Sequence, residues 1–231
     1  MSIQEKIKHS HDIIQRALSI SKKPFVAFSG GKDGLIVAHM LTQHDTNIKM
    51  VCEISHTFPA VLNDIKSITK QYNFQVEFVD SLDDLWLKKN SHFIFTHDTN
   101  IHKVFNSQRQ QRTLKKFQKA GAYDCTFTGR TKHDNMVKAE IYTTKNHGLQ
   151  AHPIREFTEQ DVWDYFKHTN LRIPMIYKTK FGERTGNSPW FAMGYKNKGL
   201  SISKAWEYVN ELDPEKSFYN EFKDYVKKDF C

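Results

Sequence analysis

The stretch that decides the fold is Phe25-Val26-Ala27-Phe28-Ser29-Gly30-Gly31-Lys32-Asp33-Gly34. Its first four residues form an apolar run between Pro24 and the glycines, and such a run is typical of a short buried strand. The apolar residues that follow Gly34 recur at helical spacing as far as Gln43. The stretch therefore predicts a strand and a helix joined by a glycine-rich loop.

The loop between this strand and this helix has the composition of an anion site. Consecutive glycines let backbone N–H groups turn inward, and the start of the helix adds unpaired N–H groups and the positive end of its dipole. Ser29 offers a hydroxyl, Lys32 a positive charge, and Asp33 a carboxylate that holds either the loop amides or a magnesium ion. The spacing fits neither a Walker A loop nor the GxGxxG dinucleotide turn. We predict that the loop binds phosphate groups.

Predicted strands and helices alternate along most of the chain. The predicted strands cover residues 25–28, 48–54, 74–78 and 123–128, and the predicted helices cover residues 2–21, 35–43, 61–72, 82–89, 104–120 and 158–166. This alternation is typical of an α/β fold with a parallel sheet that helices cover on both faces. Ligands of such sheets bind at the carboxyl ends of the strands.

The pattern weakens after residue 170, where prolines and glycines interrupt the chain. We predict an α/β domain over residues 1–170 and a C-terminal extension or lid over residues 171–231, with helices at 203–211 and 216–228. A long irregular stretch in a compact protein is often functional.

Composition narrows the function classes. The 231 residues carry a formal net charge of +8, which suits an anionic partner, and the basic residues are scattered apart from a mild density at 109–119 and 178–198. No run of about 18 apolar residues and no secretory signal is present, so we expect a cytoplasmic protein without a membrane span. The cysteines Cys52, Cys125 and Cys231 are far apart, which argues against a cysteine-ligated zinc site or cluster. Cys52 and Cys125 fall in predicted strands and are expected to be buried and inert.

Four segments in order resemble one family. The phosphate loop resembles the PP-loop of the adenine nucleotide alpha-hydrolase superfamily, and three later segments narrow the resemblance to its phosphoadenosine phosphosulfate (PAPS) reductase-like branch. These are His56-Thr57-Phe58-Pro59, Thr126-Phe127-Thr128-Gly129-Arg130 and the stretch from His152 to Trp163. The last one contains Thr158-Glu159-Gln160-Asp161, which also has the pattern of a capping box.

The resemblance implies a Rossmann-like, HUP-type parallel sheet that holds an adenine nucleotide, PAPS or ATP, across the strand ends. Thr57 is expected near the adenosine or its phosphates, and Arg130 is expected to neutralise phosphate or sulfate oxygens, a role for which a planar guanidinium is suited. Lys32 and Arg130 are the expected catalytic residues, with Cys231 as a weaker candidate. The expected nucleotide-binding residues are Ser29, Gly30, Gly31, Lys32, Asp33, Gly34, Thr57, Gly129 and Arg130.

The sequence departs from the family pattern at three places, and these departures affect the expected chemistry more than the expected nucleotide binding. Gly34 replaces the last PP-loop serine and removes one hydroxyl, and the segment after Arg184-Thr185-Gly186 lacks the paired cysteines with which relatives bind an iron–sulfur cluster. No such cluster and no protein-bound metal are therefore expected. PAPS reductases carry a nucleophilic cysteine near the C-terminus in a Glu-Cys-Gly-Leu-His context, whereas here Cys231 is terminal and lacks that context. A terminal carboxylate beside it should raise the pKa of its thiol and weaken it as a nucleophile.

Three functions stay open at this point. The first is a PAPS reductase-like enzyme of sulfur metabolism that works with a thioredoxin-like reductant. The second is an ATP pyrophosphatase, with Mg²⁺ as a candidate cofactor, that adenylates a small molecule or a nucleic acid bound through residues 109–119. The third is a non-catalytic or regulatory nucleotide-binding protein. An enzyme, either an oxidoreductase or a transferase, is the expectation, and we expect a homo-oligomer.

Overall fold

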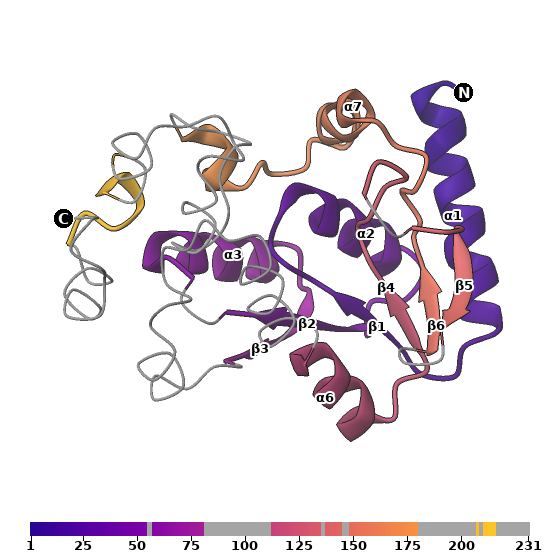
Figure 1. Ribbon diagram of the computed structural model, residues 1–231. Helices are drawn as coiled ribbons and strands as arrows, with labels where there is room; N and C mark the ends of the chain where they lie inside the picture. The colour runs from indigo at the N-terminus through magenta and orange to yellow at the C-terminus, as the bar shows by residue number, and fades with distance from the viewer. Residues whose placement is uncertain are drawn as a thin grey trace. The chain divides into compact units, whose positions relative to one another are not determined.

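The computed structural model describes residues 1–54, 57–80, 112–134, 137–144, 148–179, 207 and 210–215 (Figure 1). The chain divides into two compact units, each described by itself below. Unit 1 comprises Met1–Cys52, Ser67–Phe78 and Leu114–Pro174, and unit 2 comprises the remaining residues. The phosphate loop, Ser29–Gly34, belongs to unit 1, as do β1 before it and β4 beside β1.

A six-stranded sheet has the order β3-β2-β1-β4-β6-β5. β1 pairs in parallel with β2 and with β4, β4 pairs in parallel with β6, and β5 is antiparallel to β6. The central position of β1 explains its apolar sequence, because Phe25 and Val26 are fully buried. The strands are β1 (Pro24–Ala27), β2 (Lys49–Glu53), β3 (Gln75–Val79), β4 (Cys125–Phe127), β5 (Ile141–Thr144) and β6 (Gly148–Ala151).

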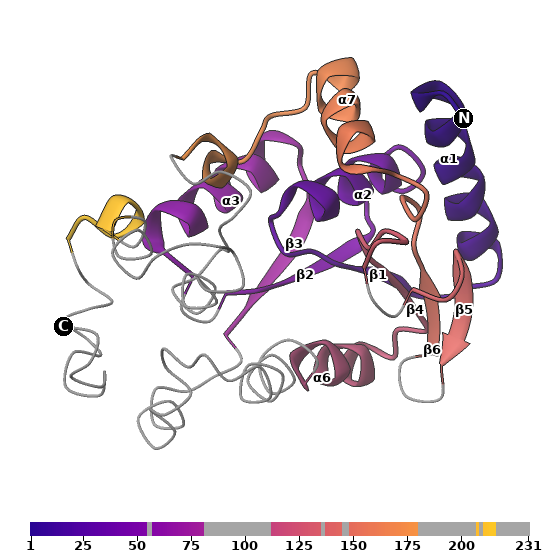
Figure 2. The ribbon, with the colours of Figure 1, turned by 45° about the horizontal axis from the view of Figure 1, so that its top comes forward.

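Helices lie on both faces of the sheet. Figure 2 shows α1, α2 and α7 on one face and α6 on the other. The helices are α1 (Ile3–Ser19), α2 (Lys32–Thr42), α3 (Pro59–Gln71), α6 (Arg112–Gly121) and α7 (Glu159–Thr169), and Met175–Lys178 forms the 3₁₀ helix η3. α2 is the most apolar of these helices in sequence, and seven of its eleven residues are buried, so it forms the centre of its layer.

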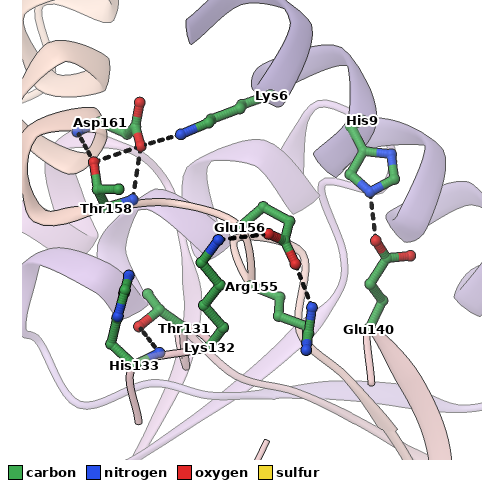
Figure 3. Close-up of polar contacts among 10 residues, drawn as sticks. All are labelled: Lys6, His9, Thr131, Lys132, His133, Glu140, Arg155, Glu156, Thr158 and Asp161. Atoms are coloured by element: carbon green, nitrogen blue, oxygen red, sulfur yellow. Dashed lines mark hydrogen bonds and ion pairs between the residues drawn. The ribbon is translucent and has the colours of Figure 1, made fainter. Parts of the chain in front are cut away.

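Ion pairs attach α1 to the later part of unit 1. The Lys6 ammonium lies 2.5 Å from the Asp161 carboxylate, and His9 Nε2 lies 2.5 Å from the carboxylate of Glu140, just before β5 (Figure 3). The same carboxylate of Glu140 also pairs with Arg16 at 2.7 Å. Asp161 also closes the capping box of α7 with Thr158, as the sequence predicts. The Asp161 carboxylate thus both caps the N-terminus of α7 and pairs with Lys6 of α1.

In unit 2, the first half of α3 supplies two buried side chains and a hydrogen bond to the start of η3. Val61 and Ile65 are buried, and the Asp64 carboxylate accepts a hydrogen bond of 2.7 Å from the backbone N–H of Met175. The start of η3 is therefore attached to α3.

The predicted α/β class is confirmed, and most predicted elements occur within a few residues of their expected bounds. The sequence analysis missed the β5–β6 hairpin, whose strands have only four residues each and little apolar alternation. Within α7, Tyr165 is buried, whereas Trp163 is only half-buried. The helices predicted over 82–89 and 216–228, and the first part of the one predicted over 104–120, lie outside the described residues.

Candidate functional site

The phosphate loop joins β1 to α2 in the way that the sequence predicts. Gly31 is the N-cap of α2, and no side chain caps the first turn of the helix. Gly30 has a φ of 73°, in the left-handed region that glycine adopts without strain. The Ser29 hydroxyl accepts a hydrogen bond from the Gly31 N–H at 3.3 Å, which folds the loop back onto itself. An uncapped helix start preceded by glycines is a ready-made anion site.

The segment that follows β4 lies directly against this loop. A Cβ atom placed on Gly129 would lie 2.5 Å from the carbonyl carbon of Asp33 and 2.7 Å from the backbone nitrogen of Gly34. Such distances are far below van der Waals contact, so the absence of a side chain at Gly129 is what permits the approach. The predicted pairing of the phosphate loop with the Thr128-Gly129-Arg130 segment is therefore present in unit 1.

The Lys32 side chain is held between two carboxylates. Its ammonium lies 3.4 Å from Asp33 Oδ2 and 3.4 Å from Glu159 Oε1, and only 12% of the side chain is exposed. The pKa of the Asp33 carboxyl is raised above its ordinary value, mainly because the side chain is buried. The positive charge of Lys32 opposes this rise in pKa, and the negative charge of Asp134 adds to it. The lysine therefore offsets the negative charge of these two acids.

A second cluster of charged side chains comes from the segments that follow β4 and β6. Arg130 is exposed to solvent. The Lys132 ammonium lies 3.0 Å from Glu156, which also receives the Arg155 guanidinium (Figure 3). The backbone N–H of Lys132 donates to the Arg155 carbonyl at 2.8 Å, so the loop after β4 and the turn after β6 are joined.

His152 is a residue of this region that the sequence analysis did not select. It is fully buried, and its Nδ1 lies 2.7 Å from the hydroxyl of Thr128, in the segment that contacts the phosphate loop. Burial is the main cause that lowers the pKa of His152, to about 4, and the charges of Arg130 and Arg155 lower it further. The histidine begins a segment of the family resemblance, but that segment assigned it no role, and the strand before it, β6, is not revealed by the sequence pattern.

The remaining predicted site residues belong to unit 2 or lie outside the described residues. Thr57 belongs to unit 2, where its backbone N–H donates to the Ile54 carbonyl at 2.9 Å. Cys231 and the segment from Arg184 to Gly186 lie outside the described residues. His133, in the loop that follows Arg130, is exposed. Within the described ranges, no group of three or more His, Cys, Asp or Glu side chains could hold a metal ion.

The comparisons with known proteins agree with this geometry. The family model described as "Phosphoadenosine phosphosulfate reductase domain" matches residues 23–189, more than half of the chain. The chain belongs to this family. The matched range of the PAPS reductase domain contains every described residue of the candidate site, from Ser29 to Glu159. No curated protein matches the chain in sequence.

A solved structure confirms the fold of this PAPS reductase domain. The chain is similar to the crystal structure of phosphoadenylyl-sulfate (PAPS) reductase from Candida auris in complex with phosphate, with a TM-score of 0.61 and 11% sequence identity. The match covers 76% of this chain and 89% of that one. An identity this low shows the Rossmann-like fold alone. No helix in the described part of the chain is long and apolar enough to cross a membrane.

Adding a side chain at Gly34 is expected to stabilise the fold, and restoring the family's serine there is expected to strengthen nucleotide binding. A Cβ atom at Gly34 would lie 3.5 Å from the backbone nitrogen and the hydroxyl of Ser29, which is ordinary contact distance. We expect Gly34→Ala to raise the free energy of unfolding by about 0.5–1 kcal/mol, because Gly34 lies within α2. Gly34→Ser should gain less from helix propensity but should bind ATP more tightly through the added hydroxyl. Thermal melts and calorimetric titrations test both, and a destabilised Gly34→Ala would contradict the loop geometry.

The buried neutral state of His152 predicts that stability falls in acid. The pKa of His152 is about 4 in the folded chain, against 6.5 for an ordinary histidine. The unfolded chain therefore takes up the proton first, so the contribution is complete above pH 6.5 and is lost as the pH falls toward 4. The loss at pH 4 relative to pH 7 should be roughly 3 kcal/mol. Urea unfolding at both pH values should show a smaller difference for His152→Asn, and an equal difference would refute the prediction.

Proposed function

We propose that this PAPS reductase domain binds an adenine nucleotide, PAPS or ATP, with its phosphates on Ser29–Gly34, and acts at the phosphate or sulfate end. The observation that carries the proposal is the backbone contact between Gly129 and the Asp33–Gly34 peptide. This contact brings the Arg130 segment beside an uncapped helix start, so donors from two strand ends converge at one place.

The charges around the loop support binding of a polyanion. Lys32 is almost buried and pairs with Asp33 and Glu159, both of which can turn away when phosphate arrives. Exposed Arg130 can form a bidentate contact with a phosphate or sulfate. Mg²⁺ is a candidate cofactor, and Asp33 is the acidic side chain of the loop that would face it.

Reduction of a sulfonucleotide needs a reactive thiolate, and two of the three cysteines are poor sources. Cys52 and Cys125 are free but buried. Burial raises the pKa of Cys125 to about 12, so its thiol is not ionised at neutral pH. Cys231 is thus the cysteine to test as the nucleophile, with a thioredoxin-like protein as the reductant. In that reaction the thiolate sulfur would attack the sulfur of PAPS, and the bond between that sulfur and the oxygen of the 5′-phosphate would break, which would release adenosine 3′,5′-bisphosphate and leave an S-sulfocysteine. The two thiols of reduced thioredoxin would then displace sulfite from it, return the cysteine to its thiol form and become a disulfide.

The inert thiols of Cys52 and Cys125 also favour a second candidate function. An ATP pyrophosphatase needs no cysteine, since Lys32 and the loop amides would stabilise charge that develops on the phosphates as the acceptor is adenylated. The exposed lysines Lys116 and Lys119 on α6 would suit a nucleic-acid acceptor. A third candidate is a regulatory protein that binds the nucleotide without turnover.

One set of assays separates these functions. The purified protein is incubated with PAPS plus reduced thioredoxin, and separately with ATP, Mg²⁺ and candidate acceptors such as tRNA. Sulfite release that is lost in Cys231→Ser supports the reductase, and acceptor-dependent pyrophosphate release supports the pyrophosphatase. Tight binding without either product supports the regulatory protein. Absence of binding to both nucleotides would refute the proposed function.

A further inference from the structure

Two buried nitrogen atoms in the described part of unit 1 have no hydrogen-bond partner. They are Nε2 of His152 and Nε of Arg155, which lie three residues apart in the turn after β6. The His152 side chain is fully buried, and the backbone N–H of Arg155 donates to the His152 carbonyl at 3.1 Å. A buried polar atom without a partner is costly, so folded proteins keep one mainly where a ligand or water completes it.

The His152 ring is fixed in place by its other contacts. Its Nδ1 lies 2.7 Å from the Thr128 hydroxyl, and the Tyr142 ring stacks on it with centroids 5.4 Å apart. The backbone N–H of His152 also donates to the Glu140 carbonyl at 2.8 Å. When the Thr128 hydroxyl donates to Nδ1, the ring proton resides on Nε2, and the unpartnered atom is a hydrogen-bond donor.

The charged groups around the ring are mainly cationic. Among the described residues, Arg130 and Arg155 act on it as positive charges and Asp134 as a negative charge. The neighbouring aromatic group is Tyr142. A neutral N–H donor that lies within the influence of these two positive charges is suited to an oxyanion, because Arg130 and Arg155 would attract an anion even though Arg155 also pairs with Glu156.

We propose that His152 Nε2–H and Arg155 Nε–H form an oxyanion subsite that holds the terminal phosphate or sulfate group of the bound nucleotide. Thr128 connects this subsite to the phosphate loop, because it contacts His152 and directly precedes Gly129. The inference rests on the proposed function and deepens it, since it adds two residues from the turn after β6 to the site. His152 acts there as a neutral donor, and a bound oxyanion raises the pKa of the imidazole.

Calorimetric titrations with PAPS and ATP test the subsite in matched variants. His152→Asn retains a polar atom near the position of Nδ1 but has none at Nε2, whereas His152→Gln places its amide near Nε2. We expect His152→Asn to weaken binding of at least one nucleotide tenfold to a hundredfold, as for loss of a hydrogen bond to a charged group, and His152→Gln to restore part of it. Loss for PAPS alone assigns the subsite to sulfate, and loss for ATP as well assigns it to phosphate. The control is His133→Asn at an exposed histidine of the preceding loop, which should bind like the unaltered protein.

Nitrogen-15 NMR of the imidazole provides a readout in the unaltered protein, so the test does not depend on the stability of a buried variant. Inorganic sulfate is the probe. We expect sulfate to shift the Nε2 resonance of His152 and to raise its pKa, while the resonances of His133 stay unchanged. If nucleotides bind and His152→Asn binds them equally well, the subsite is refuted and the proposed function stands. If neither nucleotide binds, the proposed function fails, and the sulfate titration alone decides whether the subsite exists.

Discussion

Replacing Gly129 with alanine is expected to lower the affinity for ATP or PAPS by about two orders of magnitude and to destabilise the fold by about 1–3 kcal/mol. The added Cβ would lie 2.5 Å from the Asp33 carbonyl carbon and 2.7 Å from the Asp33 oxygen and the Gly34 nitrogen. All three are backbone atoms, so no side chain can rotate away. Either the phosphate loop or the end of β4 must move, and both carry donors of the proposed site.

Calorimetry and urea unfolding measure the two effects separately. Gly34→Ala is the matched control for adding a methyl group to the same loop, because its Cβ has 3.5 Å of room and should not destabilise the chain. If Gly129→Ala retains both nucleotide affinity and stability, the close approach of the two segments is wrong. A loss of stability with normal affinity would mean that the phosphates bind elsewhere.

Replacing Lys32 with methionine is expected to weaken nucleotide binding by about 30-fold to 5000-fold, which corresponds to the roughly 2–5 kcal/mol typical of an unpaired buried charge. The reason is twofold. The variant loses the cation that contacts the phosphates, and it leaves the Asp33 and Glu159 carboxylates to repel them. A titration with ATP at fixed ionic strength measures the loss.

A double variant separates the two causes of that loss. Adding Glu159→Gln to Lys32→Met removes one repelling carboxylate and should recover part of the affinity, while the direct contact of the lysine with phosphate stays lost. Glu159→Gln alone should bind ATP at least as well as the unaltered chain, because Lys32 is then held by one carboxylate fewer. Unchanged affinity of Lys32→Met would refute the assignment of the phosphate loop.

Local sequence signals predicted the elements that form the site. The apolar run at β1, the glycines of the loop and the capping box at Thr158 and Asp161 each act within a few residues, so sequence spacing alone determines them. The structure confirms these three features. The family pattern also predicted that the segment at Gly129 and Arg130 belongs with the loop.

Contacts between distant segments were not predictable from the same signals. The distance between Gly129 and Asp33 depends on β4 being the neighbour of β1, and strand order is not encoded in hydrophobic periodicity. The pairing of Lys32 with Glu159 depends on α7 approaching the start of α2. His152 was missed for a similar reason, because its hydroxyl partner Thr128 follows a different strand.

The central position of β1 has a consequence for how the domain folds. Val26 pairs with Met50 on one side and with Phe127 on the other, and Lys6 of α1 pairs with Asp161. β1 thus obtains its partner β2 early, but β1 obtains its second neighbour, and α1 its ion pair with α7, only after more than a hundred further residues have joined the chain. Because closing such long loops is entropically unfavourable, folding should be slow, and during synthesis β1 and α1 must wait with exposed apolar surfaces until β4 and α7 emerge.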